Sequence, residues 1–483
     1  MNLKLVSRVL AFLLLIVAAM MLTPVVVAWY YEELHLVRHF LIPIGVTAVV
    51  ASAFLIFTRS EESELATREG FFLVAASWVL VSLLGAIPLY TSGAIPRFVD
   101  AFFETMSGFT TTGASILTDI EALPRSMLFW RSLTHWLGGM GIIVLTVAIF
   151  PILGIGGLQL LKAEAPGPTV DKITPKVTET AKILWLTYFG LTAAETLLLL
   201  IGGMDLFDAL THTFGTLATG GFSPKNASVG YFTSPFVHVV ITAFMVLAGI
   251  NFVMYYKLLT GRGLELKRDT ELKAYLTIFA VGSLATAAAL HVNGVYDGFG
   301  TSLRFGAFQT ASILTTTGYV TTDFAAWPAM SQAILFVLMF VGGCAGSTGG
   351  GIKVVRVVTL LKQGFNEMRY LLHPRGVFGV KLNGVSVRKN VVYAISGFVF
   401  LYVIVLLATT LVVASGGYEL QTSFSTALVT LGNIGPGFGL VGPSENYAFF
   451  QDYIKWFLSF VMMLGRLEVF TVLIVFTPFF WRR

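Results

Sequence analysis

Long apolar runs are the feature that most restricts how this chain can fold. A helix needs roughly 20 mainly apolar residues to cross a bilayer, and ten stretches approach or exceed that length. They are residues 9–30, 36–58, 69–90, 126–156, 180–202, 233–259, 273–292, 328–360, 389–415 and 453–480. The alternation of apolar and polar residues that marks membrane β-barrels is missing. The runs therefore predict an all-α polytopic membrane protein.

Composition excludes the main alternatives. Only 12% of the residues are charged, against roughly 25% in soluble domains, so a water-facing surface could not be covered. A soluble multidomain enzyme and a disordered chain are both excluded. Cys344 is the single cysteine, which excludes a disulfide scaffold. The first run is too long for the apolar part of a signal peptide, so we expect a retained membrane helix.

Basic residues predict how the chain lies in the membrane. With a cytoplasmic N-terminus, the cytoplasmic segments hold 23 of the 31 Lys and Arg residues, as the positive-inside rule requires. Both termini are then cytoplasmic. The basic stretch 353–389 would also suit nucleic-acid binding, but topology explains the same charges, so no nucleic-acid partner is expected. Trp29 and Tyr30, at the end of the first run, are typical of contacts with membrane lipid at the interface.

Four stretches on the outer side fit neither a spanning helix nor a simple loop. They are residues 97–122, 205–227, 297–325 and 418–447. Each begins with a semi-polar run that is too short to cross the membrane, and each then reaches a strip rich in threonine or glycine. One glycine of each strip recurs at spacings of 107, 98 and 117 residues, at Gly113, Gly220, Gly318 and Gly435. This period predicts a fourfold pseudo-repeat within one chain.

Each predicted unit contains a spanning helix, a short pore helix, a filter strip and a second spanning helix, and the four units surround one pore. Residues 1–68 form an N-terminal two-helix extension. The units cover residues 69–160, 178–262, 270–375 and 388–483, and the third has a broken second helix. The short helices would direct the negative ends of their dipoles toward the axis, which favours a cation there.

The strips have the chemistry of a cation filter. A dehydrated cation needs a ring of oxygens, which carbonyls of non-helical backbone can supply. Glycine permits the backbone angles and lets the chains approach the axis. No strip contains a carboxylate, which argues against a filter built from acidic rings. The candidate filter residues are Thr111, Thr112, Gly113, Ala218, Thr219, Gly220, Thr316, Thr317, Gly318, Asn433, Ile434 and Gly435.

Two features on the inner side have alternative interpretations. The glycine-rich stretch 342–351 either packs helices closely through small residues or forms a loop that blocks ions beneath the filter. A nucleotide P-loop is excluded because the Gly-Lys-Ser/Thr signature is missing. Arg466 lies within the last span, where a charge is costly and suggests function. It either holds helices together in an ion pair or sets a barrier under the filter. Glu468 is not its obvious partner, because residues two apart face different directions on a helix.

Polar residues on the short helices are expected to anchor them by hydrogen bonds, with attraction of cations as the alternative. They are Asp100, Glu104, Asp208 and His212. His135, near Ser132 and Thr134, does not indicate a hydrolase, because no nucleophile elbow and no partnered acid accompany it. A membrane enzyme is therefore not expected.

These patterns resemble the Trk/Ktr/HKT superfamily of potassium transporters over essentially the whole chain. The segments that carry the resemblance are SGFTTTG (107–113), ATGGFS (218–223), TTTGY (315–319), GNIGPG (432–437), GGCAGSTGGG (342–351) and GRLE (465–468). The extra N-terminal helix pair is similar to the TrkH and TrkG type and not to the shorter KtrB type. Each strip shares only one glycine with the filters of tetrameric potassium channels, so fewer ion sites and looser selectivity are expected.

The resemblance implies potassium uptake across a bacterial inner membrane, with potassium ions bound at the candidate filter residues. It implies a homodimer and a cytosolic TrkA-type nucleotide-binding regulatory subunit, since the chain has no dinucleotide-binding fingerprint of its own. Basic segments near 162–182, 257–273 and 353–389 are the expected docking surface. It also implies that the intramembrane loop is the gate. The expected gate residues are Gly342, Gly343, Gly346, Ser347, Thr348, Gly349, Gly350, Gly351 and Arg466.

A secondary transporter with alternating access is the rival hypothesis. Such folds usually contain two inverted repeats and helices broken at the midplane, whereas the four strips here recur in the same sense and favour a channel-like path.

Overall fold

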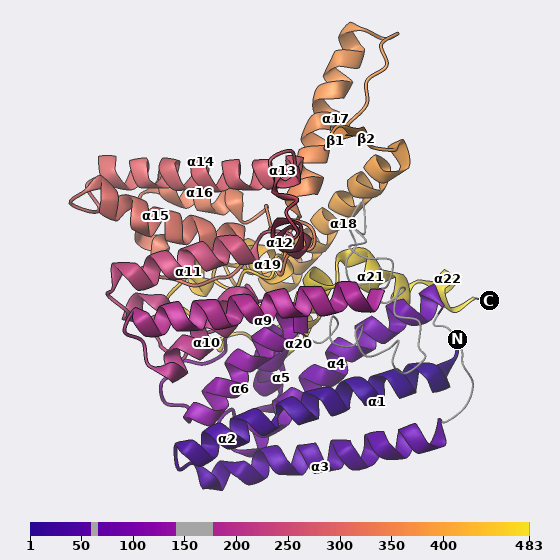
Figure 1. The fold of residues 1–483 in the computed structure, drawn as a ribbon, viewed down its shortest axis with the longest axis vertical. Coiled ribbons are helices and arrows are strands. Elements are labelled where there is room, and N and C mark those ends of the chain that lie inside the picture. Colours follow the sequence, from indigo (N-terminus) through magenta and orange to yellow (C-terminus); the bar gives the residue numbers. More distant parts are fainter. Residues whose placement is uncertain (59–65, 142–176, 483) are drawn as a thin grey trace.

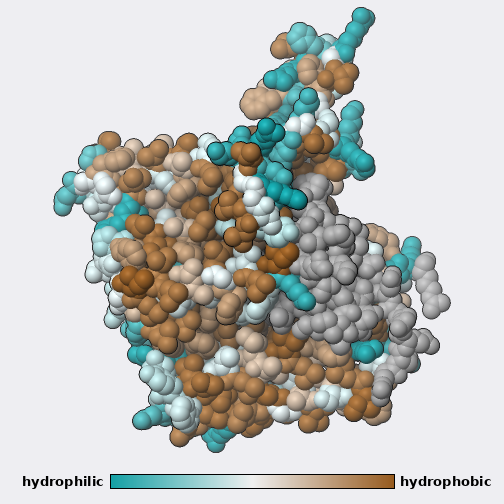
Figure 2. All heavy atoms as spheres, viewed as in Figure 1, coloured by the Kyte–Doolittle hydropathy of each residue, from teal (hydrophilic) through white to brown (hydrophobic). Residues whose placement is uncertain are grey.

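The structure is a computed structural model that describes residues 1–58, 66–141 and 177–482. Within these ranges it is mostly helical, and its strands are the short antiparallel pair β1 (Lys381–Leu382) and β2 (Val385–Ser386). Six helices are long and apolar enough to cross a membrane, and two bent helix pairs raise the number to 8 if each is one span. Apolar side chains cover most of the visible face of the body (Figure 2). The predicted all-α polytopic class is therefore confirmed.

The N-terminal helices lie together along one edge of the bundle (Figure 1). Helix α1 (Leu3–Met20) continues almost directly into α2 (Leu22–Tyr30), and both pack against α3 (Leu34–Phe57). The Glu33 carboxylate joins this group to the next part of the chain, because it accepts hydrogen bonds from the backbone N–H groups of Arg125 (2.7 Å) and Ser126 (2.9 Å). It thereby caps the start of α6.

One order of elements then recurs four times: a long helix, a short helix, an extended strip and a second helix. The first two units contain α4 (Thr67–Thr91), α5 (Phe98–Phe109) and α6 (Arg125–Trp136), then α9 (Val177–Ile201), α10 (Leu206–Leu217) and α11 (Pro235–Ala248). The last two contain α14 (Thr270–Val292), α15 (Phe299–Leu314) and α16 (Ala329–Leu338), then α18 (Lys389–Ala414), α19 (Leu420–Leu431) and α20 (Asp452–Arg466).

All four second helices are interrupted, although a break was expected only in the third. Helix α6 passes into a π-helical turn, η1 (Leu137–Gly141). Helix α11 meets α12 (Phe252–Leu259) at 95°, where Asn251 caps α12, and α20 meets the segment led by α21 (Val469–Leu473) at 118°. The spans expected over 233–259 and 453–480 are thus bent and not continuous. The expected span 126–156 and the end of the first unit lie outside the described residues beyond position 141.

The third unit has the longest interruption. Helix α16 ends at Leu338, residues 339–353 are non-helical, and α17 (Val354–Leu372) follows. Helix α17 and the β1–β2 hairpin project from the bundle as an arm (Figure 1), and hydrophilic residues gather on this arm (Figure 2). The short helix α13 (Gly263–Leu266) lies near the base of the arm, before α14. The beginning of α1 and the last helix, α22 (Pro478–Trp481), lie at the same end of the bundle.

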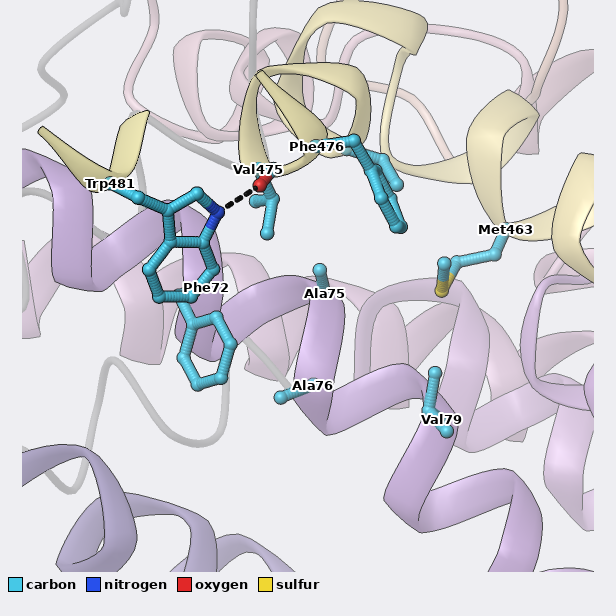
Figure 3. A pocket seen from close by; sticks show the side chains of 9 residues that line it. Phe72, Ala75, Ala76, Val79, Met463, Val475, Phe476 and Trp481 are labelled. Carbon is cyan, nitrogen blue, oxygen red and sulfur yellow. Dashed lines mark hydrogen bonds between the residues drawn. The ribbon is translucent and has the colours of Figure 1, made fainter. Parts of the chain in front are cut away.

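A cavity of about 440 Å³ separates α4 from the C-terminal elements (Figure 3). Its walls include Phe72, Ala75 and Val79 on α4 and Met463 on α20. The polar Nε1 of Trp481 is already engaged, because it donates to the Val475 carbonyl oxygen of η5 (Ile474–Phe476) at 2.9 Å. An apolar wall of this kind offers no ligands to an ion, so the candidate site is sought at the strips.

Candidate functional site

Each short helix ends in the same backbone turn, and this turn starts the strip. The first strip residue after the helix cap is left-handed, at Thr111, Thr219, Thr316 and Asn433, with φ of 53°, 54°, 59° and 53°. Two residues later a glycine is left-handed, at Gly113, Gly221, Gly318 and Gly435, with φ of 77°, 78°, 80° and 90°. Positive φ is unusual for a β-branched residue. The three threonines therefore hold local strain that their surroundings enforce, a feature that concentrates at functional sites.

These angles correct the alignment of the second strip. Gly221, and not Gly220, is the counterpart of Gly113 and Gly318. The candidate residues 218–220 were therefore placed one position too early, and the equivalent residues are 219–221. Because the strip contains two adjacent glycines, spacing alone could not separate them. An aromatic residue follows the ring glycine in the second and third strips, as Phe222 and Tyr319, and this was the available clue.

The four strips close into a ring through glycine–carbonyl contacts. In each contact a Cβ added to the glycine of one strip would collide with a carbonyl oxygen of the next strip, and the fourth strip meets the first. The pairs are Gly113 with Gly220 O (2.2 Å), Gly221 with Thr317 O (2.1 Å), Gly318 with Ile434 O (2.1 Å) and Gly435 with Thr112 O (2.7 Å). Only glycine allows backbones to approach this closely. The four units therefore build one continuous ring of backbone.

Three carbonyl oxygens of this ring accept no hydrogen bond from the described residues. The middle N–H of each strip bonds back to its own short helix, as in Thr112 N to Ser107 O (2.9 Å) and Ile434 N to Val429 O (2.8 Å). Within the described residues, the carbonyl oxygens of Thr112, Thr317 and Ile434 accept no hydrogen bond, and these residues are fully buried. Buried carbonyls without a partner are uncommon. A dehydrated cation on the axis would supply the missing interaction.

Hydrogen bonds from side chains support the ring. The hydroxyl groups of Thr110 and Thr112 lie 2.8 Å apart, and Asn433 Nδ2 donates to the Thr112 hydroxyl at 2.8 Å. Tyr319 donates its hydroxyl hydrogen to the His212 carbonyl at 2.9 Å, and Tyr447 donates to the Gly435 carbonyl at 2.7 Å. These hydroxyl groups hold the strips in position, so some of the threonine hydroxyls have a structural role.

The polar residues of the short helices anchor them, which agrees with the preferred interpretation. Glu104 pairs with Arg131 at 2.5 Å and also accepts hydrogen bonds from the Ser115 hydroxyl and the Ile116 N–H, both at 2.9 Å. The other three anchors are Asp100 with Lys455 (2.6 Å), Asp208 with Lys225 (3.4 Å) and His212 with Ser223 (3.0 Å). Arg131 also donates to the Ser223 carbonyl and lies over the Phe222 ring, so it links the first two strips.

The glycine-rich loop 342–351 lies against the strips where they leave the short helices. Gly350 N donates to the Thr316 hydroxyl at 2.6 Å, and a Cβ added to Gly350 would lie 2.5 Å from the Gly432 carbonyl oxygen. The Thr348 hydroxyl donates to the Ala248 carbonyl at the α11–α12 bend, at 3.2 Å. The loop therefore touches the starts of the third and fourth strips, and close helix packing does not describe it.

Arg466 connects this loop to the ring. Its guanidinium donates to the Thr348 carbonyl oxygen at 2.6 Å and to the Thr111 hydroxyl at 3.1 Å. It also donates to the Gly138 carbonyl oxygen in η1 at 2.7 Å. Glu468 pairs with Arg356 instead, as its position two residues from Arg466 predicted. Arg466 is thus a positive charge at the start of the first strip, held by the loop, the strip and η1 together.

Comparison with known proteins identifies relatives over the full length of the chain. The family model described as "TrkH: Cation transport protein" matches residues 39–483. The chain is 43% identical to the Trk system potassium uptake protein TrkH of Salmonella typhimurium over 88% of each chain. It is 39% identical to the TrkH protein of Halomonas elongata over 100% of both. The crystal structure of the potassium transporter TrkH from Vibrio parahaemolyticus matches with a TM-score of 0.89, 36% identity and 100% coverage of both chains.

Proposed function

The chain belongs to the TrkH family of cation transport proteins, and on that premise we propose that it takes up potassium ions through the ring formed by the four strips. Its curated relatives are potassium uptake proteins. The family membership confirms a membrane transport protein and not an enzyme. The ring itself is the observation that carries the proposal, because four equivalent backbone segments meet there with buried carbonyl oxygens that accept no hydrogen bond from the part of the chain that the structure describes.

We assign potassium binding to the strip residues on the basis of this geometry. The carbonyl oxygens of the ring replace the water shell of the ion, and the dipoles of α5, α10, α15 and α19 add negative potential at their C-terminal ends. The strips contribute Thr111, Thr112, Gly113, Ala218, Thr219, Gly220, Gly221, Thr316, Thr317, Gly318, Asn433, Ile434 and Gly435. Gly221 enters this set because its φ and its contact match those of the other ring glycines.

We also propose that the loop 342–351 is the gate and that Arg466 sets the inner barrier. The loop lies directly inside the strips, and Arg466 binds both. At a distance of about 5 Å and an effective dielectric near 20, the repulsion between its charge and a potassium ion is roughly 3 kcal/mol. Movement of the loop and of this side chain would therefore open the path. The loop contributes Gly342, Gly343, Gly346, Ser347, Thr348, Gly349, Gly350 and Gly351.

The placement in the cell is part of the proposal. We place the protein in a bacterial inner membrane, as a homodimer with both termini and the projecting arm in the cytoplasm. The ends of the described chain lie on one side of the bundle (Figure 1), which supports an even number of crossings. The arm and segment 257–273 offer basic residues to a cytosolic TrkA-type nucleotide-binding subunit. Of the third expected docking segment, 162–182, residues up to 176 lie outside the described part.

An uptake assay with a matched glycine pair tests the pore. The purified chain in liposomes should take up radioactive rubidium in preference to sodium, and Gly318→Ser should abolish this uptake. Gly190→Ser in α9 is the control, because no atom lies within 4 Å of its added Cβ. Equal flux of all cations, including large organic ones, would refute the filter. A fixed ratio of potassium to a coupled ion, measured from the reversal potential, would support alternating access instead.

Removing charge from the arm tests the regulatory partner. Replacing Lys362 and Arg369 of α17 by glutamine should weaken binding of the nucleotide-binding subunit, and the loss should grow at low ionic strength, where surface charges act most strongly. Normal complex formation by this variant would contradict the docking surface. The same substitutions leave the ring untouched, so the ion preference should not change.

A further inference from the structure

The tip of the cytosolic hairpin is joined to the start of α14 by three hydrogen bonds. Asn383, in the turn between β1 and β2, accepts from Thr270 N at 2.7 Å through its side-chain oxygen. Its side-chain nitrogen donates to the Asp269 carboxylate at 2.9 Å, and its own N–H donates to the Thr270 hydroxyl at 3.0 Å. Asn383 has φ of 52°, a left-handed angle that asparagine adopts more readily than most residues. The turn is therefore shaped to make this contact.

The next residue of α14 holds the glycine-rich loop. The Glu271 Oε1 atom accepts hydrogen bonds from Ala345 N at 2.7 Å and from Val355 N at 3.1 Å. Ala345 lies in the middle of the loop, and Val355 lies in the first turn of α17. One carboxylate oxygen thus ties the loop and the base of the arm to the same helix end.

Three consecutive residues, 269–271, therefore connect parts of the chain that are far apart in sequence. Asp269 and Thr270 bind the turn of the β1–β2 hairpin, and Glu271 binds the first turn of α17 and the loop. Glu271 lies in the first turn of α14, where the positive end of the helix dipole favours a carboxylate. The start of α14 thus contacts both the projecting arm and the non-helical loop.

We infer that Glu271 is a positioning residue that keeps the loop beneath the filter and couples it to the arm. When the arm is displaced, the Asn383 contact and the Val355 contact change together, and the shared carboxylate passes the displacement to Ala345. The loop then leaves its place against Thr316 and Gly432. This inference rests on the proposed gate, and it adds the route by which a cytosolic partner reaches that gate.

Three variants test the route at its two ends. Glu271→Ala removes both loop contacts, Glu271→Gln keeps an uncharged accepting oxygen, and Asn383→Gly keeps the left-handed angle while removing the side-chain bonds. Glu265→Ala and Val385→Ala are the matched controls, because they change an exposed carboxylate of α13 and an exposed side chain of β2. Purified full-length chains are reconstituted in liposomes and planar bilayers for rubidium flux and open-probability measurements.

Release of the loop should raise the open probability without changing ion preference. We expect roughly a tenfold increase for Glu271→Ala, because hydrogen bonds from two backbone N–H groups are lost, and a smaller increase for Glu271→Gln and Asn383→Gly. The rubidium-to-sodium ratio should stay at the wild-type value, which a general loss of structure would not allow. The double variant Glu271→Ala/Asn383→Gly should show less than the product of the two effects, since both act through one support.

Two results would overturn the inference. Wild-type open probability in Glu271→Ala, with selective wild-type flux, would remove the residue from the gate while leaving the filter intact. Fully multiplicative effects in the double variant would show that arm and loop are independent. If Glu271→Ala gives no flux, hydrogen exchange of residues 342–356 decides: faster exchange than in wild type supports the route, and unchanged exchange contradicts it. Absence of selective flux in the wild type itself would instead refute the proposed function.

Discussion

The four strips and the four second helices belong to the same units but differ in regularity. The strips repeat one backbone pattern four times, a left-handed residue followed two positions later by a left-handed glycine. The second helices of the four units are interrupted in four different ways. The interruptions are a π-helical turn, two bends of unequal angle and a long non-helical loop. A ring of equivalent oxygens around one axis requires four strips with the same backbone, whereas a gate requires one unit that differs from the other three. On the proposed function, the strips select the ion and the irregular third unit gates the path.

The largest effect is expected from a methyl group in the ring. Gly318→Ala places a Cβ 2.1 Å from the Ile434 carbonyl oxygen at φ of 80°, so two strips must separate and the equivalence of the four is lost. Rubidium uptake in liposomes should fall to the level of empty liposomes. Gly190→Ala, which meets no atom within 4 Å, should retain uptake. Selective uptake by Gly318→Ala would show that the ring does not need its close contacts.

The second strip offers a sharper test of the same regularity. A Cβ on Gly221 meets the Thr317 backbone oxygen at 2.1 Å, whereas a Cβ on Gly220 meets the His135 ring at 2.5 Å. Uptake by Gly220→Ala should therefore be restored in part by His135→Ala, because a side chain can be trimmed. Gly221→Ala should stay inactive in the same background. If Gly221→Ala regains rubidium uptake in the His135→Ala background and Gly220→Ala does not, Gly220 is the glycine of the ring.

An intermediate effect is expected where the loop meets the ring. Arg466→Ala removes the bonds to Thr348 and Thr111 together with the positive charge. Even one charged hydrogen bond contributes roughly 1.5–3 kcal/mol, so the rate of flux should rise by at least about tenfold while the ion ratio changes little. Arg262→Ala, at an exposed position before α13, is the control. An unchanged uptake rate and affinity would remove Arg466 from the mechanism.

The smallest effect is expected at the bend between α11 and α12. Asn251 caps α12 through a hydrogen bond from Val253 N at 2.9 Å, and loss of such a cap costs about 1 kcal/mol. Asn251→Ala should therefore lower the melting temperature slightly in detergent and leave the ion ratio unchanged. Asn251→Asp keeps the accepting oxygen and should melt close to the wild type. A large change in ion preference would mean that the bends take part in selection.

Much of the architecture was accessible from the sequence because its causes are local. Apolar runs predicted the helices, and the recurring Thr/Gly strips predicted four equivalent units, since hydropathy and glycine content act within one segment. The candidate filter remains a prediction, and its alignment was displaced by one residue in the second strip, because no local pattern distinguishes Gly220 from Gly221. The bend after α20 was missed because Glu468, with φ of 58°, carries no turn signature.

What the sequence determined by itself is therefore the class of the protein, a membrane-spanning helical chain with four strips able to line an ion path. Only the tertiary structure decided which glycine enters the ring, since that depends on a carbonyl from a neighbouring unit. It also decided the partners of Arg466 and Glu271, which lie 118 and 74 residues away at Thr348 and Ala345. Contacts between distant segments follow from the way the units pack, and no local pattern of residues records that packing.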